Sequence, residues 1–470
     1  MGMAGQMAER GAVSTVRAYA TGELFCGVGG LSRGFHAQGF AARFANDIWD
    51  LAVHNFLMNF DKSYAEAGGR QAGEILGLPR SVEDVDPAEI MRQVRSPRGT
   101  ASLAHGELDV LLGGPPCQGF SVNSHIRNGD DPRNSLFKHY VRILKGLAPK
   151  VFVLENVPGM FSLEGGRFFD ELLTQIGALN SLEYGGYETR FKILNASHYG
   201  VPQERFRLVL IGTRRDIVDE VGAVEVPEPV HYSLAQAHFK GGRTHTFHYA
   251  IGHQRIKGVS AVPLLHVSLL PPISVEAAIG DLPPLANGGG VEGAIPYGGA
   301  RQLSDFQKCM RLGSRVLTNH WARALLPPNT ERIKHIPEGG DWRSIPHELL
   351  PAGMQRALRK DHTTRYGRLS RDQLAGTLLT KPDPHWGTFI HYDLNQQRLI
   401  SVREAARFQS FPDAHRFYGG QVDQYRLCGN AVPPLLAEAI AVNVKEKLDA
   451  HYGRATDVET SVEYPMAVNA

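Results

Sequence analysis

GELFCGVGGLSRGF, residues 22 to 35, begins as an apolar run and turns at a group of glycines into a segment of helical period. Gly27, Gly29 and Gly30 permit a tight turn where the backbone can approach a ligand before a helix starts. Asp47 ends the next apolar run, 20 residues after Gly27. An acidic side chain at that distance can accept hydrogen bonds from ribose hydroxyls in nucleotide-binding α/β folds. The two features together predict a strand–turn–helix unit that binds a nucleoside-like ligand.

Short apolar runs alternate with segments of helical period through the first half of the chain. This alternation is typical of an α/β fold with a mostly parallel, doubly wound sheet. Leu136, Tyr140 and Leu144 are spaced by four and line one helical face, and residues 432 to 448 read as an amphipathic helix that begins with two prolines. The expected strands are residues 22–27, 41–47, 108–114, 151–157, 191–196 and 207–213.

Composition narrows the class of protein. A chain of 470 residues with 42% hydrophobic residues has the length for two or three globular domains. Its four cysteines lie far apart without zinc or disulfide spacing, which favours a reducing cytoplasm. The first residues lack the apolar core of a signal peptide, and no uncharged apolar run reaches about 18 residues. Secretion and a membrane span are therefore not expected.

Charge is spread unevenly, although the net charge is only +2. Residues 231–400 hold 20 Lys and Arg against 12 Asp and Glu. Such a surplus is typical of a polyanion-binding module, and equally of a solvated surface. No alternation of strands and helices is legible from about residue 215 to 400, so this part is interpreted as a separate domain.

Cys117 stands in GGPPCQGFS, residues 113 to 121, directly after the third of the main strands. The carboxyl end of a parallel strand faces the ligand crevice of an open α/β sheet, so Cys117 and the glycine turn are expected to share one edge. Pro115 and Pro116 put the thiol on a stiff turn outside the sheet. A free cysteine is ordinarily a small buried hydrophobe. This setting instead favours a nucleophile, which nearby positive charge would help to ionise.

Polar side chains stand at two neighbouring strands. Glu155 ends the apolar run VFVLENV, and Gln203, Arg205 and Arg207 lie in YGVPQERFR. Glu155 is either paired with an arginine or kept partly protonated by burial, so that it can donate to a substrate nitrogen. Arg205 and Arg207 face the same way along a strand, as two surface charges would also do. Their convergence with Cys117 on one crevice favours a catalytic site.

Seven segments resemble, in order, the motifs of the DNA (cytosine-5)-methyltransferases. The likeness covers residues of about 20–215 and 398–450. One cofactor position departs from the commonest form of the family: Cys26 stands where a small Ala or Ser often does. The segments are FCGVGG (25–30), GGPPCQGFS (113–121), DPRNSLF (131–137), ENVPG (155–159), YGVPQERFR (199–207), REAARFQSFPD (403–413) and GNAVPP (429–434).

The resemblance implies a Rossmann-like fold that uses S-adenosylmethionine as methyl donor, releases S-adenosyl-L-homocysteine and needs no metal. Asp47 would hold the ribose and Asp84 the adenine amino group, while residues 65–80 resemble an insertion. Asn430 would close the pocket, so the C-terminal helix should pack back against the first strand. The implied cofactor residues are Phe25, Gly27, Gly29, Gly30, Leu31, Asp47, Ile48, Asp84, Val85, Pro115, Asn430 and Ala431.

The resemblance also implies a mechanism. The Cys117 thiolate would attack carbon 6 of a flipped cytosine, Glu155 would act at ring nitrogen 3, and Arg205 would help to hold the base. The catalytic set is Cys117, Glu155, Arg205 and Arg207. Residues 120–133 would form a lid, and the implied DNA contacts are Gln118, Ser121, Asn123, Arg127, Arg133, Arg365 and Arg368.

The expected layout is a catalytic domain at residues 18–220, a smaller, irregular target-recognition domain at 221–400, and a hinge and return at 401–455. Residues 1–17 and 456–470 are expected to be flexible tails. The expected partner is double-stranded DNA, with a cognate restriction endonuclease that forms no stable complex. A monomer in the bacterial cytoplasm, associated with the nucleoid and not with a membrane, is expected.

Three other functions are less consistent with the sequence. A tRNA cytosine methyltransferase shares this scaffold, but the long recognition region and Gly119, Phe120 and Ser121 argue against it. A catalytically idle DNA-binding relative should have lost Cys117 or Glu155. An NAD-dependent oxidoreductase would leave the PPCQ and ENV segments without a role.

Overall fold

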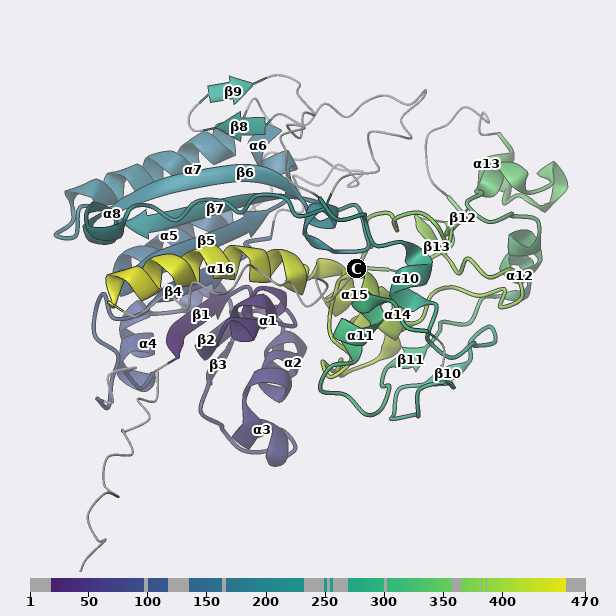
Figure 1. Cartoon of the computed structure of the whole chain (residues 1–470), viewed down its shortest axis with the longest axis horizontal. Helices are drawn as coiled ribbons and strands as arrows, with labels where there is room; N and C mark the ends of the chain where they lie inside the picture. The colour runs from purple at the N-terminus through teal and green to yellow at the C-terminus, as the bar shows by residue number, and fades with distance from the viewer. Residues whose placement is uncertain are drawn as a thin grey trace, which may run out of the picture.

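The computed structural model shows a lobe built on a sheet and a second lobe of short helices and loops, with α16 lying along the sheet lobe (Figure 1). It describes residues 18–96, 100–116, 135–162, 166–231, 249–251, 254–256, 269–299, 302–356, 365–381, 383–385 and 387–453.

The sheet has seven strands in the order β3-β2-β1-β4-β5-β7-β6. β7 runs antiparallel to both its neighbours, and every other pairing in the sheet is parallel. The carboxyl ends of β1, β2, β4 and β5 therefore lie side by side along one edge, where β7 begins. The strands are β1 (Tyr19–Leu24), β2 (Phe40–Asp47), β3 (Leu76–Pro79), β4 (Val110–Gly113), β5 (Val151–Asn156), β6 (Tyr187–Asn195) and β7 (Phe206–Arg214).

Helices cover both faces of the sheet. One apolar cluster joins α1, α16 and strand residues such as Val110 and Val153, and another joins α4, α5 and α7 to Leu111 and Phe152 on the opposite face. A sheet covered on both faces is the doubly wound α/β class that the sequence predicts. The helices of this lobe are α1 (Gly30–Ala37), α2 (Asp50–Phe60), α3 (Lys62–Glu66), α4 (Pro87–Gln93), α5 (Leu136–Leu147), α6 (Gly159–Ser162), α7 (Arg167–Gly177), α8 (Arg215–Val221) and α16 (Pro434–His451).

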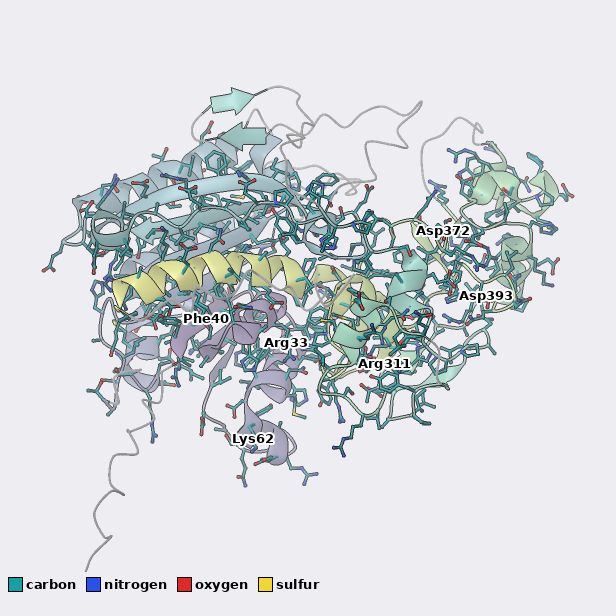
Figure 2. The ribbon with its side chains drawn as sticks, viewed as in Figure 1. Arg33, Phe40, Lys62, Arg311, Asp372 and Asp393 are labelled. Atoms are coloured by element: carbon teal, nitrogen blue, oxygen red, sulfur yellow. The ribbon has the colours of Figure 1, made fainter. Side chains whose placement is uncertain are left out.

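The second lobe is held by a buried ion network. Arg407 donates to both carboxylate oxygens of Asp413, at 2.8 and 2.6 Å, and to Asp281 at 2.9 Å. Arg311, labelled in Figure 2, also donates to Asp281, at 2.7 Å. Burial of such charges is tolerated because each has opposite partners. The elements of this lobe are α10 (Val275–Ile279), α11 (Asp305–Arg311), α12 (Pro327–Lys334), α13 (Ala352–Gln355), α14 (Val402–Phe408), α15 (Gln421–Asn430) and the short strands β10 (Gly290–Val291), β11 (His320–Trp321), β12 (Gly367–Arg368) and β13 (Thr388–Ile390). The short strands β8 (Tyr249–Ile251) and β9 (Gln254–Ile256) lie on the sheet lobe, where β8 contacts β6 (Figure 1).

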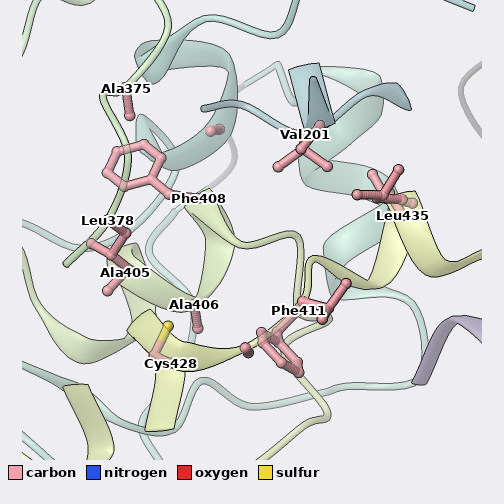
Figure 3. Close-up of a cluster of buried hydrophobic side chains, with 14 of the residues drawn as sticks. Val201, Ala375, Leu378, Ala405, Ala406, Phe408, Phe411, Cys428 and Leu435 are labelled. Atoms are coloured by element: carbon pink, nitrogen blue, oxygen red, sulfur yellow. The ribbon is translucent and has the colours of Figure 1, made fainter. Parts of the chain in front are cut away.

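The two lobes share apolar packing. Phe408 and Cys428 lie with Ala375 and Leu378 in one cluster, which continues to Leu435 at the start of α16 (Figure 3). The same buried cluster reaches the sheet through α16 and α1. The hydrophobic core is therefore continuous from the sheet to the second lobe.

The structure confirms the mostly parallel α/β sheet and contains all six expected strands, with shifted ends. β1 stops at Leu24 because Phe25 has a positive φ of 56° and turns the chain. β3 was missed, because Leu76–Pro79 is a short edge strand inside the segment interpreted as an insertion. The C-terminal helix does reach the first strand, since the Tyr19 hydroxyl donates to Asp449.

One helical stretch, Gln421–His451, has the length and composition of a membrane span. Within its most apolar window, 78% is buried inside the structure. Its apolar surface thus serves the core of this fold.

Candidate active site

The glycine turn after β1 is joined to the end of β2. Gly27 and Gly29 have φ of 52° and 81°, and the backbone N–H of Gly27 donates to Asp47 Oδ2 at 3.0 Å. The N–H of Trp49 donates to Asp47 Oδ1 at 3.0 Å. Each carboxylate oxygen keeps a further lone pair, so Asp47 can still accept hydrogen bonds from a ligand.

The GNAVPP segment lies against the same turn. A Cβ on Gly30 would stand 2.1 Å from the carbonyl oxygen of Val432, so only glycine allows this approach. Leu31 is buried, and only its backbone could reach a ligand. Asn430 ends α15 with an exposed side chain, and Ala431 follows it. The structure therefore brings the last motif beside the first, as expected.

Three further expected cofactor positions flank this region. Ile48 follows Asp47 and exposes 73% of its side chain, an unusual cost for a large apolar residue in water. Asp84 is exposed after β3, while Val85 is buried and its carbonyl accepts from Arg142 at 2.9 Å. Ile48 and Asp84 thus offer side chains to a ligand, and Val85 offers only backbone.

Burial raises the pKa of Asp47 above its usual value, while hydrogen bonds from Trp49 and Gly27 and the charge of Arg426 oppose the shift. Arg426 also stacks on Trp49, with its guanidinium carbon 4.6 Å from the ring centroid. The hydrogen bonds and the positive charge of these neighbours thus oppose the effect of burial, although the net shift of the pKa remains upward.

Glu155 lies at the same sheet edge and is paired with an arginine. Arg207 Nε is 2.6 Å from Glu155 Oε1, and both side chains are nearly buried. Burial, the largest cause, raises the pKa of Glu155, and the charges of Arg207 and Arg205 lower it. A carboxyl in this balance can hold a proton more readily than an exposed one and still accept from a donor.

The segment leading to Cys117 contacts the end of β5, at Glu155 and Asn156. The Asn156 amide donates to the carbonyl of Pro115 at 3.1 Å, and its own oxygen accepts from Val157 N–H at 2.8 Å. A Cβ on Gly114 would stand 3.1 Å from Glu155 Oε2. The chain therefore passes directly over the Glu155 carboxyl before it reaches Cys117.

Cys117 itself, with Gln118, Ser121, Asn123, Arg127 and Arg133, lies outside the described residues. For these six positions the sequence-based predictions stand as predictions.

Arg205 differs from the expectation that it holds the base. It is 2% exposed, and its guanidinium donates to the carbonyls of Leu378, Gly429 and Ala431 at 3.2, 2.8 and 3.1 Å. These bonds use the two terminal nitrogens of Arg205, and the ion pair with Glu155 is made by Arg207. Arg205 instead ties the second lobe to the GNAVPP segment.

We expect Arg205→Met to lower the free energy of unfolding by about 2 to 4 kcal/mol, because it removes three charged hydrogen bonds and leaves buried carbonyls unsatisfied. Urea denaturation measures this. Arg215→Met is the matched control, since Arg215 has 44% side-chain exposure and pairs with Glu188, and should change stability by less than about 0.5 kcal/mol. Equal losses in the two variants would contradict the role given to Arg205.

The prediction that Arg368 contacts DNA is wrong. Arg368 is 1% exposed and donates to the carbonyls of Ile336, His391 and Ile333, at 2.8, 2.7 and 2.8 Å. A DNA contact needs an exposed guanidinium, but tertiary packing placed this arginine in the core. Arg365 is half-buried and its own carbonyl accepts from Trp342 N–H at 3.0 Å.

Sequence reasoning overlooked Asn156 and Arg426. Asn156 could have been suspected from its place beside Glu155 in ENV, whereas nothing local to Arg426 links it to Trp49. Within the described ranges no group of three or more His, Cys, Asp or Glu could hold a metal ion.

A comparison with known families identifies the chain. The model of the C-5 cytosine-specific DNA methylases matches residues 19–241 and 329–446. The chain belongs to this family. The Type II methyltransferase M.AgeI of Thalassovita gelatinovora is 30% identical to this methylase over 479 residues, covering 90% of this chain and 98% of that protein.

Other relatives extend the comparison. M.Bpa9945I, a Type II methyltransferase of Bacillus paralicheniformis, is 27% identical over 489 residues and is covered to 99%. DNA (cytosine-5)-methyltransferase 4 of Arabidopsis thaliana is 32% identical over 455 residues, which are 28% of its length. A prophage-encoded E. coli protein described as a DNA modification methyltransferase shares the fold of this methylase, with a TM-score of 0.60, 22% identity and 92% of this chain covered.

The residues present fit S-adenosylmethionine, the cofactor that membership of this family implies. Around the turn, Gly27 leaves open space where a side chain would otherwise stand. Asp47 supplies acceptors for hydroxyl groups, and Ile48 supplies exposed apolar surface for an aromatic base. No cluster of phosphate-binding donors is required for such a ligand, which carries no phosphate.

Proposed function

We propose that this methylase transfers a methyl group from S-adenosylmethionine to carbon 5 of cytosine in duplex DNA. The observation that carries the proposal is the Glu155–Arg207 pair beneath the segment leading to Cys117, on the sheet edge that also holds the Asp47 turn. A nucleophile, an acid and a cofactor turn on one edge are what this chemistry needs.

Cys117 begins the reaction. Its thiolate forms a bond to carbon 6 of cytosine, while Glu155 donates its proton to ring nitrogen 3, so that the electron pair of the broken 5,6 double bond becomes available at carbon 5. Arg207 keeps Glu155 oriented and would meet charge that develops on the base. The bound cofactor supplies an electrophilic methyl group on a sulfonium. Loss of the carbon 5 proton to a base then restores the 5,6 double bond as the Cys117–carbon 6 bond breaks, and ring nitrogen 3 returns its proton to the Glu155 carboxylate.

Cytosine inside a duplex is out of reach of such a site, so we propose that the target base is flipped out, at a cost of a few kcal/mol. Residues 120–133 would close over it as a lid. Gln118, Ser121, Asn123, Arg127, Arg133 and Arg365 are the proposed DNA contacts. The basic surplus in residues 231–400 supports a DNA-facing role for the second lobe.

The cofactor residues give a direct prediction. We expect Asp47→Ala to raise the Kd for S-adenosylmethionine by at least about tenfold, because it removes the acceptor for the ribose hydroxyls and frees the N–H groups of Gly27 and Trp49. Isothermal titration of the cofactor measures this. Asp372→Ala, which alters a carboxylate of the second lobe, should bind normally. Unchanged affinity in Asp47→Ala would refute the ribose contact.

Bisulfite sequencing of duplex DNA incubated with the protein and the cofactor tests the proposed function. Protected cytosines within one short sequence are the expected result. A parallel incubation with tRNA tests the other substrate class that this scaffold accommodates. Methylation of tRNA alone, or of neither substrate, would overturn the proposal.

We propose that the chain is organised as a catalytic domain at residues 18–220, a target-recognition domain at 221–400 and a hinge and return to the catalytic domain at 401–455. The family model leaves residues 242–328 unmatched, which supports placing a chain-specific recognition function there. Because M.AgeI is named as a Type II methyltransferase, we propose a restriction-modification role in the bacterial cytoplasm, as a nucleoid-associated monomer with no stable endonuclease complex.

A further inference from the structure

Arg426 lies in α15, outside the seven segments that resemble the family's motifs. It is exposed, and Asn430, four residues later, ends the same helix with an exposed side chain. Residues four apart on a helix lie on one face. The face of α15 that carries Asn430 therefore also carries Arg426.

One contact of Arg426, and its positive charge, relate it to the end of β2. Its guanidinium carbon stands 4.6 Å from the centroid of the Trp49 ring, a cation–π distance. Its charge acts on Asp47, whose carboxylate accepts the N–H groups of Gly27 and Trp49. Arg426 thus lies beside a carboxylate already fixed by its neighbours.

We propose that Arg426 is a positioning residue for the cofactor: by stacking on Trp49, whose N–H donates to Asp47, it aligns the Asp47 carboxylate. The proposal rests on the proposed ribose contact of Asp47. An ionised carboxylate can accept from ribose hydroxyls through its remaining lone pairs, whereas a protonated one loses part of that capacity.

The charges around Asp47 make the prediction specific. Glu23 on β1 and the Cys26 thiol are electrostatically coupled to Asp47, and neither supplies positive charge. Arg426 is the cation that opposes the effect of burial on the pKa of Asp47. Without it the pKa of Asp47 rises further, so the ionised form is lost at a higher pH as the solution is acidified.

The test measures the Kd for S-adenosylmethionine by isothermal titration at pH 8.0 and pH 5.5. For Arg426→Met we expect an increase of about threefold at pH 8.0, because the cation–π contact is lost, and a larger increase at pH 5.5, because the loss of the charge adds to it. Arg426→Lys should bring the ratio between the two pH values back toward that of the wild type. At saturating cofactor, kcat should stay within about twofold of the wild type.

Two controls distinguish a positioning role of Arg426 from a merely structural one. Arg70→Met alters an arginine that is also exposed and should bind the cofactor normally at both pH values. Combining Arg426→Met with Asp47→Asn should add little to the loss seen in Asp47→Asn alone, because the charge that Arg426 supports is gone. A merely structural role would instead lower the unfolding midpoint and raise Kd equally at both pH values.

An unchanged Kd in Arg426→Met, an increase of equal size at both pH values, or a lysine variant that behaves like methionine would overturn the positioning role. Normal cofactor binding by Asp47→Asn would overturn the proposed ribose contact, and the positioning role with it. A weakened Asp47→Asn with an unaffected Arg426→Met would overturn the positioning role alone.

Discussion

Cys117→Ser is expected to lower the rate of methyl transfer by at least about 10⁴-fold and to leave the affinity for S-adenosylmethionine unchanged. A serine hydroxyl is barely ionised near neutral pH, and it is a far weaker nucleophile than a thiolate. Without the bond to carbon 6, carbon 5 of cytosine does not become reactive. Transfer of a radiolabelled methyl group to duplex DNA measures the rate, and titration measures the affinity.

Cys309→Ser is the matched control for this variant. Cys309 lies on α11 and is half-buried, and burial raises the pKa of its thiol to about 11, so it is not a thiolate near neutral pH. This control should keep normal activity. A second readout uses DNA with 5-fluorocytosine at the target site, which should become covalently trapped on the wild type and on Cys309→Ser. Normal turnover by Cys117→Ser, or trapping on it, would refute the role of Cys117 as the nucleophile.

Glu155→Gln is expected to lower kcat by about 10²- to 10⁴-fold, the usual contribution of a positioned acid. The amide keeps the size of the side chain and can donate to ring nitrogen 3, but it cannot transfer a proton. It also loses the charge that pairs with Arg207 at 2.6 Å. Single-turnover methylation at saturating DNA and cofactor measures the chemical step.

The pH profile gives a second measurement of the same carboxyl. Burial raises the pKa of Glu155, and the proposed mechanism needs its protonated form. Wild-type kcat should therefore fall as the pH rises through that pKa, and Glu155→Gln should lose this limb. Glu188→Gln, at a partly exposed carboxylate on β6, should keep both the rate and the profile. An unaltered profile in Glu155→Gln would remove Glu155 from the role of acid.

The sequence determined the sheet and its catalytic edge to a large extent. The glycine turn, Asp47 and the apolar runs ending near Glu155 are local patterns, and local patterns set strands, turns and the period of buried faces. In a parallel sheet the carboxyl ends of the strands lie along one edge, so their proximity follows from the strand assignment. The union of the glycine turn with Asp47, and of Glu155 with the segment before Cys117, was accordingly predictable.

Only the tertiary structure decided which arginine does what. Arg205 and Arg207 are two residues apart and look equivalent in the sequence, yet Arg207 meets Glu155 while Arg205 donates to carbonyls of Leu378, Gly429 and Ala431. Arg368 looked like a surface charge and lies buried among backbone carbonyls. The partners of a long charged side chain come from distant segments, so their identity depends on packing.

Arg426 is another charged residue whose partners could not be predicted from the sequence. Trp49 and Asp47 lie nearly 400 residues away along the chain, and their contact with α15 exists because α16 carries the C-terminal segment back to α1. The positions of strands and turns follow from neighbours in sequence, because the period of apolar residues and the conformational preferences of glycine and proline act locally. The assignment of each charge follows from which carbonyls and carboxylates the folded chain brings within reach, because electrostatic and hydrogen-bonding energies depend on distance in space.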